Sequence, residues 1–348
     1  VHTITGTAGN ANTIYSQTST FTGLGTENIT ISGETNNSLA ASVLNTLNGN
    51  TTGNINADTV TTLTGSITDL NTAYTASAAT GDGISNLGNE AITLSDTSVT
   101  DISALTTLNS NTTGNINADE VTSFTGSISD LNTMFAAKAA SGDGISFSSS
   151  SGAADQTVTI SDTTDVSVTA LTTLNGHTTG NIDASGVTSL ASASISDIKT
   201  LLTAGNNHTN NFTSTSFNDL ATVAVSGTSI SVADLNDSIT QANTATTDPT
   251  TTVFSVSSGA TITTGDEAAF TTLLSNEEAG NIAITDQNLT VSSGTISVDN
   301  ANALNNTTTG TVTAAIDTTE TVDELATLSG TGAYTIVING RDADAKQS

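Results

Sequence analysis

The chain has 348 residues and a formal net charge of −29, from 33 acidic side chains against 4 lysines and arginines. So few cations cannot form the basic patch that binds phosphates, which argues against nucleic-acid binding. Hydrophobic residues make up 35% of the chain and aromatic residues 3%, so we expect a thin, repetitive core, and no apolar run is long enough for membrane insertion.

The first part of the chain, residues 1–35, is predicted to be a strand-rich N-terminal cap. Its strand is expected at residues 28–32, where Ile29 and Ile31 alternate with polar residues. Alternation with a period of two residues is typical of a strand with one buried face.

From residue 36 onward the sequence repeats itself. The segment from Leu47 to Asp58 returns at residues 108–119 and, more loosely, at residues 174–184, which defines a long repeat. A shorter pattern inside it, a Ser or Thr followed three residues later by an acidic residue, begins at Ser66, Ser98, Ser127, Ser194 and Thr321. This pattern is a capping box, in which hydroxyl and carboxylate satisfy the first free amides of a helix. It predicts short helices at a step of about 30 residues.

Alternating β-branched stretches lie between these helix starts. They occupy residues 28–32, 91–95, 157–161, 281–285 and 334–338. One strand and one short capped helix in about 30 residues predicts one coil of a repeat solenoid, an α/β fold with a parallel sheet in which each coil buries its apolar stripe against the next. Because threonine is a poor helix former, an all-β solenoid is the alternative.

Repeat quality divides the rest of the chain. Residues 36–240 are predicted to form regular solenoid repeats, and residues 241–348 more degenerate repeats ending in a strand element. The break is placed near the single proline, Pro249.

No catalytic constellation is visible in the sequence. His177 holds the repeat position that Asn50 and Asn111 hold in the sister copies, while His2 is terminal and His208 lies in an Asn-rich loop. With no cysteine in the chain, nucleophile activation would depend on the scattered lysines. We therefore expect no enzyme activity and no catalytic residue.

Calcium is the cofactor that the composition leaves open. Gly81-Asp82-Gly83 and Gly142-Asp143-Gly144 are equivalent corners one long repeat apart, so Asp82 and Asp143 are the candidate calcium ligands. The alternative is that these aspartates only fill turns, as others cap helices.

One resemblance adds to these patterns. The run from Gly53 to Tyr74, followed by residues 88–97, resembles repeats in very large surface and exported proteins of marine cyanobacteria and related bacteria. The likeness covers about residues 36–200. It implies an extracellular or cell-surface location and a structural or adhesive role; similar lysine-poor solenoids occur in fibres of viruses that infect such cells, so a virion is the alternative location.

Together these observations predict a non-enzymatic structural protein, a subunit or segment of a surface layer, filament or stalk. Unpaired strand edges at the ends of a solenoid invite self-association. The last apolar strand makes Tyr334, Ile336 and Ile338 the candidate assembly residues. The alternative function is an adhesin or viral fibre module that binds a host-surface glycan or partner protein.

Overall fold

The computed structural model describes residues 2–17, 19–77, 83–137, 144–147, 155–207, 211–244 and 251–337. The chain forms two compact units, one of residues Val1–Ser161 and Gly176–Ile182, the other of Asp162–Asn175 and Asp183–Ser348. The predicted boundaries at residues 35 and 240 were placed where the regularity of the sequence repeat changes, whereas the two units are defined by contacts within each of them. The predicted division therefore stays a prediction.

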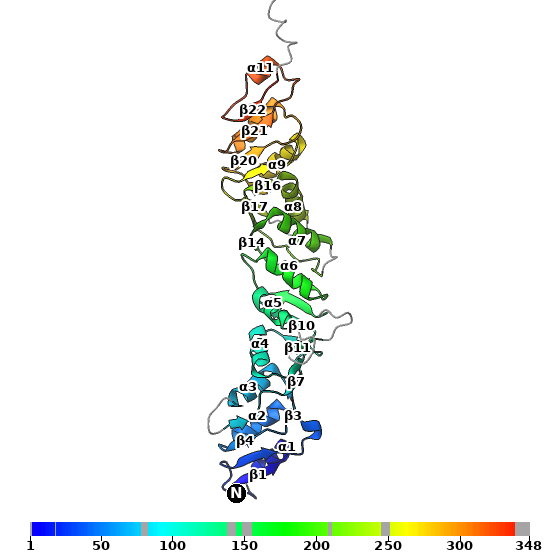
Figure 1. The fold of residues 1–348 in the computed structure, drawn as a ribbon, viewed down its shortest axis with the longest axis vertical. Coiled ribbons are helices and arrows are strands. Elements are labelled where there is room, and N and C mark those ends of the chain that lie inside the picture. The colour runs from blue at the N-terminus through cyan, green and yellow to red at the C-terminus, as the bar shows by residue number, and fades with distance from the viewer. Residues whose placement is uncertain are drawn as a thin grey trace, which may run out of the picture. The chain divides into compact units, whose positions relative to one another are not determined.

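The first unit alternates short strands with short helices (Figure 1). Its helices are α1 (Ala8–Ser16), α2 (Ala41–Asn50), α3 (Ile67–Ser77), α4 (Ile102–Asn111) and α5 (Ile128–Ala136), with a 3-10 turn at Thr35–Asn37. Its strands are β1 (Thr3–Gly6), β2 (Asn28–Ile31), β3 (Ser38–Ala40), β4 (Asn54–Asn56), β5 (Thr62–Gly65), β6 (Gly83–Ser85), β7 (Ala91–Leu94), β8 (Ser98–Val99), β9 (Asn115–Asn117), β10 (Ser123–Gly126), β11 (Gly144–Ser146) and β12 (Thr157–Ile160). The start of α4 at Ile102 corresponds to the start of α2 at Ala41, one long repeat earlier.

The second unit continues the same alternation. Its helices are α7 (Ile195–Asn207), α8 (Val232–Thr244), α9 (Glu267–Glu278), α10 (Val298–Thr307) and α11 (Val322–Leu325). Its strands are β14 (Ser189–Ser194), β15 (Thr222–Ser226), β16 (Ser229–Ser231), β17 (Val253–Val256), β18 (Thr261–Thr263), β19 (Ile282–Ala283), β20 (Asn288–Thr290), β21 (Val312–Ala315) and β22 (Ala333–Thr335). Two further elements, α6 (Val168–His177) and β13 (Ile182–Asp183), contain residues of both units.

The strand pairings that join successive repeats are parallel. In the first unit one sheet has the order β1-β2-β4-β6, a second has β11-β9-β7-β5-β3, and a third contains β8, β10 and β12. In the second unit the orders are β14-β15-β17-β19 and β16-β18-β20-β21-β22. The mixed α/β form of the prediction is therefore confirmed, and the all-β alternative is wrong.

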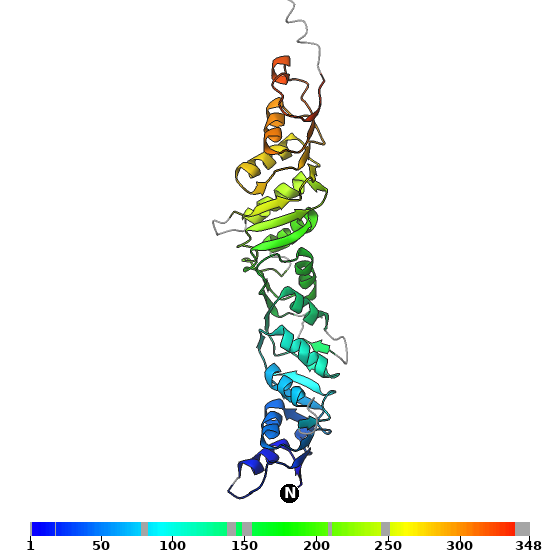
Figure 2. The ribbon, with the colours of Figure 1, turned by 90° about the vertical axis from the view of Figure 1, so that its left-hand side faces the viewer.

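The core of each unit is a rank of aliphatic side chains. In the second sheet the buried residues stand opposite one another in register, and they are Leu39, Leu63, Ile92, Ile116 and Ile145. The helices before α11 add buried residues at helical spacing, as α4 does with Ile102, Leu105 and Leu108, whereas α11 buries none. Figure 2 shows the helices of the first unit following one another beside their strands, and each contacts the next. Stacking thus buries an apolar stripe that no single repeat could cover alone.

Helix starts follow the predicted caps at most positions. The hydroxyls of Ser66, Ser127 and Ser194 accept the amides of Asp69, Asp130 and Asp197. Thr321 and Glu324 form the full reciprocal capping box. The copy at Ser98 was predicted wrongly: Ser98 lies in β8 and the side chain of Asp101 itself caps α4, because its carboxylate reaches the amide of Ala104 directly.

The last predicted strand also differs from the structure. β22 covers Ala333–Thr335 rather than residues 334–338, so Tyr334 lies in the strand and Ile336 follows it. Ile338 lies outside the described residues.

Candidate functional site

The most regular polar structure is a corner that follows α2, α4 and α10. Each corner has the sequence Thr-Thr-Gly, and the first threonine donates to a backbone carbonyl of the preceding repeat: Thr51 to Glu27, Thr112 to Glu90 and Thr308 to Gln287, at 2.8, 2.7 and 2.6 Å. The same hydroxyl accepts the amide of the glycine two residues later, as from Gly53 at 3.0 Å. One side chain therefore closes the corner and joins it to its neighbour.

The glycine of this corner is required by close backbone approach. A Cβ at Gly53 would overlap the carbonyl of Glu27, and one at Gly114 would overlap the carbonyl of Glu90. The corner thus has a physical reason to keep Gly where two backbones meet.

Buried acidic residues lie behind two of these corners. Glu27 and Glu90 are 1% and 0% exposed, and each accepts a hydrogen bond from a tyrosine hydroxyl, Tyr15 at 3.1 Å and Tyr74 at 2.9 Å. The Gly25 amide lowers the pKa of Glu27. Burial, and then the charge of Glu90, raise the pKa of Tyr74 well above its usual range, so this phenol remains a neutral donor.

The next copy replaces both partners together. Phe135 has the place of Tyr74 one long repeat later, and the buried Gln156 has the place of Glu90 behind the corner at Thr178. A phenyl ring cannot donate, and a neutral amide does not carry the charge that such a donor stabilises. Aligning the two copies of the long repeat would have shown that Tyr74 and Glu90 are replaced together by Phe135 and Gln156. The prediction of corners did not include this pair.

A second set of polar contacts joins helix to helix. The fifth residue of a helix is often Asn, whose Nδ2 donates to the carbonyl of the third residue of the next helix. These pairs are Asn12 to Val43, Asn45 to Asp69, Asn71 to Ala104, and Asn236 to Ala269, at 2.8–3.0 Å. The fifth residue of α7 is Lys199, which instead binds Asp234 and Asp237 of α8 at 2.7 and 2.8 Å. These amides were missed by sequence reasoning, although their fixed helical position was a usable signal.

Acidic side chains also cap the helix of the preceding repeat. Asp96 Oδ2 accepts the amide of Ile67 at 2.8 Å, and Glu34 Oε1 accepts that of Ala8 at 2.6 Å. The first amides of a helix have no partner within the helix, so these carboxylates satisfy them from one repeat away.

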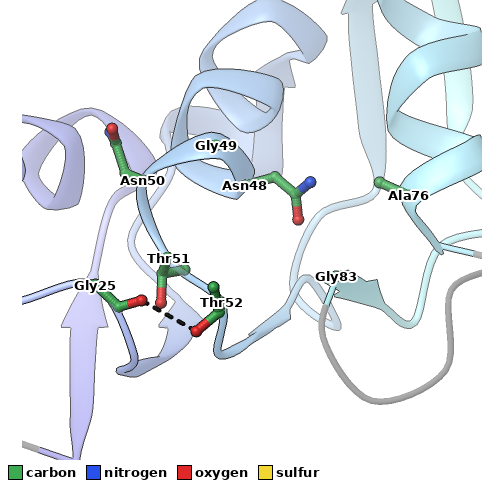
Figure 3. Close-up of a pocket in the computed structure, with 8 residues that line it drawn as sticks. All are labelled: Gly25, Asn48, Gly49, Asn50, Thr51, Thr52, Ala76 and Gly83. Carbon is green, nitrogen blue, oxygen red and sulfur yellow. Dashed lines mark hydrogen bonds between the residues drawn. The ribbon is translucent and has the colours of Figure 1, made fainter.

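A polar hollow of about 380 Å³ lies at the end of α2 (Figure 3). It is lined by Gly25, Asn48, Gly49, Asn50, Thr51, Thr52, Ala76 and Gly83. Figure 3 shows the amide of Asn48 projecting from α2 toward the side of Ala76 and Gly83, while Thr52 Oγ1 donates to the carbonyl of Gly25 at 3.2 Å. This lining offers amides and hydroxyls, which suit neutral hydrogen-bonding ligands better than proton transfer.

The predicted calcium ligands are not described. Asp82 and Asp143 both lie outside the described residues. Within the described residues, no group of three or more His, Cys, Asp and Glu side chains could hold a metal ion. Calcium at Asp82 and Asp143 stays a prediction.

The other residues singled out by sequence lie apart. His177 ends α6 and stacks on Phe135, with ring centroids 6.3 Å apart and an interplanar angle of 17°. Tyr334 is half-buried and Ile336 is 43% exposed. None of the helices that the structure describes is both long and apolar enough to cross a membrane.

Comparison with known proteins gives no further guidance. No protein-family model matches the chain, and no curated protein matches it significantly.

Proposed function

We propose that the chain is a non-enzymatic structural protein whose repeats wind into a solenoid and form part of an assembly outside the cell. The assembly would be a surface layer, filament or stalk, with the chain as its subunit or segment. The described structure has strand-helix repeats in parallel sheets. The proposal adds that these repeats are the coils of a solenoid and that the solenoid has a structural role.

One observation carries it: buried acidic side chains and helix amides are engaged in contacts that hold single repeats together and join them to their neighbours. Glu27 and Glu90 are buried and bound to tyrosines, Asp96 caps a neighbouring helix, and Asn71 spans two helices. A chain held together in this way transmits load along its stacking direction through backbone and side-chain bonds alike.

The test is electron microscopy of the purified chain, first with calcium and then with excess chelator. Ordered filaments or sheets support the structural role, and their loss on chelation would add calcium as the ion that supports the assembly. Isolated particles in both conditions at all concentrations would overturn self-assembly.

A second candidate is an adhesin or viral fibre module, and the hollow at the end of α2 is the observation in its favour. Asn48 and Thr52 present a neutral amide and a hydroxyl there, which suit the hydroxyls of a glycan. A glycan array comparing the native chain with Asn48→Ala tests this. A signal that the variant loses supports the adhesin role, while no signal from either protein counts against it.

A further inference from the structure

The residues that line the hollow at the end of α2 recur one long repeat later. Of the eight lining residues, seven have an identical counterpart around the end of α4. Asn48 corresponds to Asn109, since each is the eighth residue of its helix. The other counterparts are Gly88, Asn111, Thr112, Thr113, Ala137 and Gly144. The end of α4 is therefore surrounded by nearly the same set of side chains.

Hydrogen bonds hold the two corners in the same geometry. The Thr52 amide donates to the Gly25 carbonyl, and the Thr113 amide donates to the Gly88 carbonyl, both at 2.9 Å. The two threonine hydroxyls donate to the same carbonyls at 3.2 and 3.4 Å. Each threonine thus lies in the same place relative to the preceding repeat.

The spacing between this glycine and the helix end is repeated as well. A Cβ at Gly25 would lie 4.0 Å from the carbonyl oxygen of Asn50, and one at Gly88 would lie 3.9 Å from that of Asn111. On the other side of each corner, β6 pairs with β4 and β11 pairs with β9, again at equivalent residues. The backbone that frames the hollow is therefore the same in both copies.

One lining position differs between the copies. Gly49 is replaced by Ser110, whose hydroxyl donates to the carbonyl of Thr107 in its own helix at 2.7 Å. Because this hydroxyl is bonded back onto α4, the replacement leaves the corner as it is and adds one neutral polar group beside it.

The lining indicates the chemical class of the ligand. Neither set contains a charged or an aromatic side chain, and amides and hydroxyls exchange hydrogen bonds with sugar hydroxyls. A net charge of −29 repels anionic ligands such as sulfated glycans. With no aromatic ring to pack against a sugar, one hollow alone is expected to bind weakly. A neutral glycan that contacts two such hollows gains affinity through multivalency.

We propose that the end of α4 forms a second hollow of the same kind, and that the two hollows bind one neutral polysaccharide. All residues of both sets lie in the first compact unit. The inference rests on the adhesin candidate and names its ligand class and its second site. Two linked contacts raise the apparent affinity about 100-fold or more over one contact.

A polysaccharide array tests the proposal, with neutral polysaccharides printed beside their sulfated forms, such as dextran beside dextran sulfate. The proteins compared are the native chain, Asn48→Ala, Asn109→Ala and the double variant. Each single variant should need at least about tenfold more protein for the same signal on a neutral polysaccharide, because one of two linked contacts is lost. The double variant should give no signal.

The matched control is Asn175→Ala, which changes the eighth residue of α6. There Asn211 Nδ2 donates to the Asn175 carbonyl at 3.5 Å, so the chain itself contacts this helix end. This variant should bind as the native chain does. Circular dichroism and thermal unfolding of every variant show whether a lost signal reflects lost folding.

The outcomes separate this inference from the adhesin candidate. An effect of Asn48→Ala without an effect of Asn109→Ala would overturn the second site and leave the adhesin candidate standing. A signal kept by the double variant would place glycan binding elsewhere and also overturn the inference. Stronger signals on the sulfated forms would contradict the ligand class. If the native chain gives no signal on any glycan, the inference and the adhesin candidate both fail.

Discussion

The hydrogen bond between Tyr74 and Glu90 can be tested with a replacement that the chain itself contains one repeat later. Tyr74→Phe removes the hydroxyl that donates to Glu90 Oε2 at 2.9 Å and leaves the Gly88 amide at 2.8 Å as its donor. A hydrogen bond to a charged group contributes about 1.5–3 kcal/mol, so we expect a loss of about 2 kcal/mol in the free energy of unfolding.

Glu90→Gln has a different cost. The amide oxygen can still accept from Tyr74 and Gly88, but its nitrogen takes the place of Oε1, which is buried and has no hydrogen-bond partner among the described residues. An unsatisfied buried donor costs about 1–3 kcal/mol.

The double variant recreates the combination of Phe135 and Gln156. With Gln at position 90, Tyr74→Phe removes a hydrogen bond to a neutral amide, which contributes about 0.5–1.5 kcal/mol instead of about 1.5–3. The destabilisation of the double variant should therefore fall short of the sum of the two single losses by about 1–1.5 kcal/mol. Equilibrium urea unfolding followed by circular dichroism measures all four proteins, with equal denaturant slopes as the check that the transitions are comparable.

The control cycle combines Tyr74→Phe with Glu27→Gln. Glu27 is bonded to Tyr15, so it shares no hydrogen bond with Tyr74 and the two losses should add within about 0.5 kcal/mol. Additivity in the Tyr74 and Glu90 cycle, at the level seen in this control, would refute the reasoning that the two residues form one coupled pair.

Three other contacts can be tested by substitution. Gly53→Ala should lower the free energy of unfolding by about 1–3 kcal/mol, because the new Cβ would overlap the Glu27 carbonyl. Its control is Gly49→Ala in helix α2, where the new Cβ meets nothing within 4 Å, and this variant should raise the free energy of unfolding by about 0.5–1 kcal/mol. Urea unfolding of both variants decides this, and equal effects would contradict it. The pKa of Glu27 is lowered in the fold, so its carboxylate stabilises the protein above about pH 4.3 and that stability is lost as the pH falls through the lowered value. Glu27→Gln should therefore show a shallower loss of stability in acid titrations, and an unchanged acid limb would refute this. Lys199→Met should cost at most about 1 kcal/mol at low salt, less in 1 M salt, because Lys199 and Asp234 are both partly exposed; a loss above about 3 kcal/mol in low-salt unfolding would show a larger role for the ion pair.

The sequence alone determined the step and the local elements. Alternation in segments such as residues 91–95 predicted β7 almost to the residue, and the hydroxyls of Ser66 and Ser127 marked the starts of α3 and α5. These features depend on neighbours within a few positions, namely side-chain period and free helix amides, so they can be read from the chain directly. The prediction that Ser98 caps α4 was wrong because Asp101, directly before the first residue of the helix, is the N-cap.

Only the tertiary structure decided which segments meet. β6 and β7 are close in sequence, yet β6 pairs with β4 and β7 pairs with β5 and β9. Tyr74 and Glu90 lie 16 residues apart and Thr112 bonds a carbonyl 22 residues before it. The strand pairings and the Thr112 contact depend on how one repeat stacks on the next, and the bond of Tyr74 depends on how a helix packs against the segment that follows it. Many registers satisfy the same apolar pattern until these polar groups are paired.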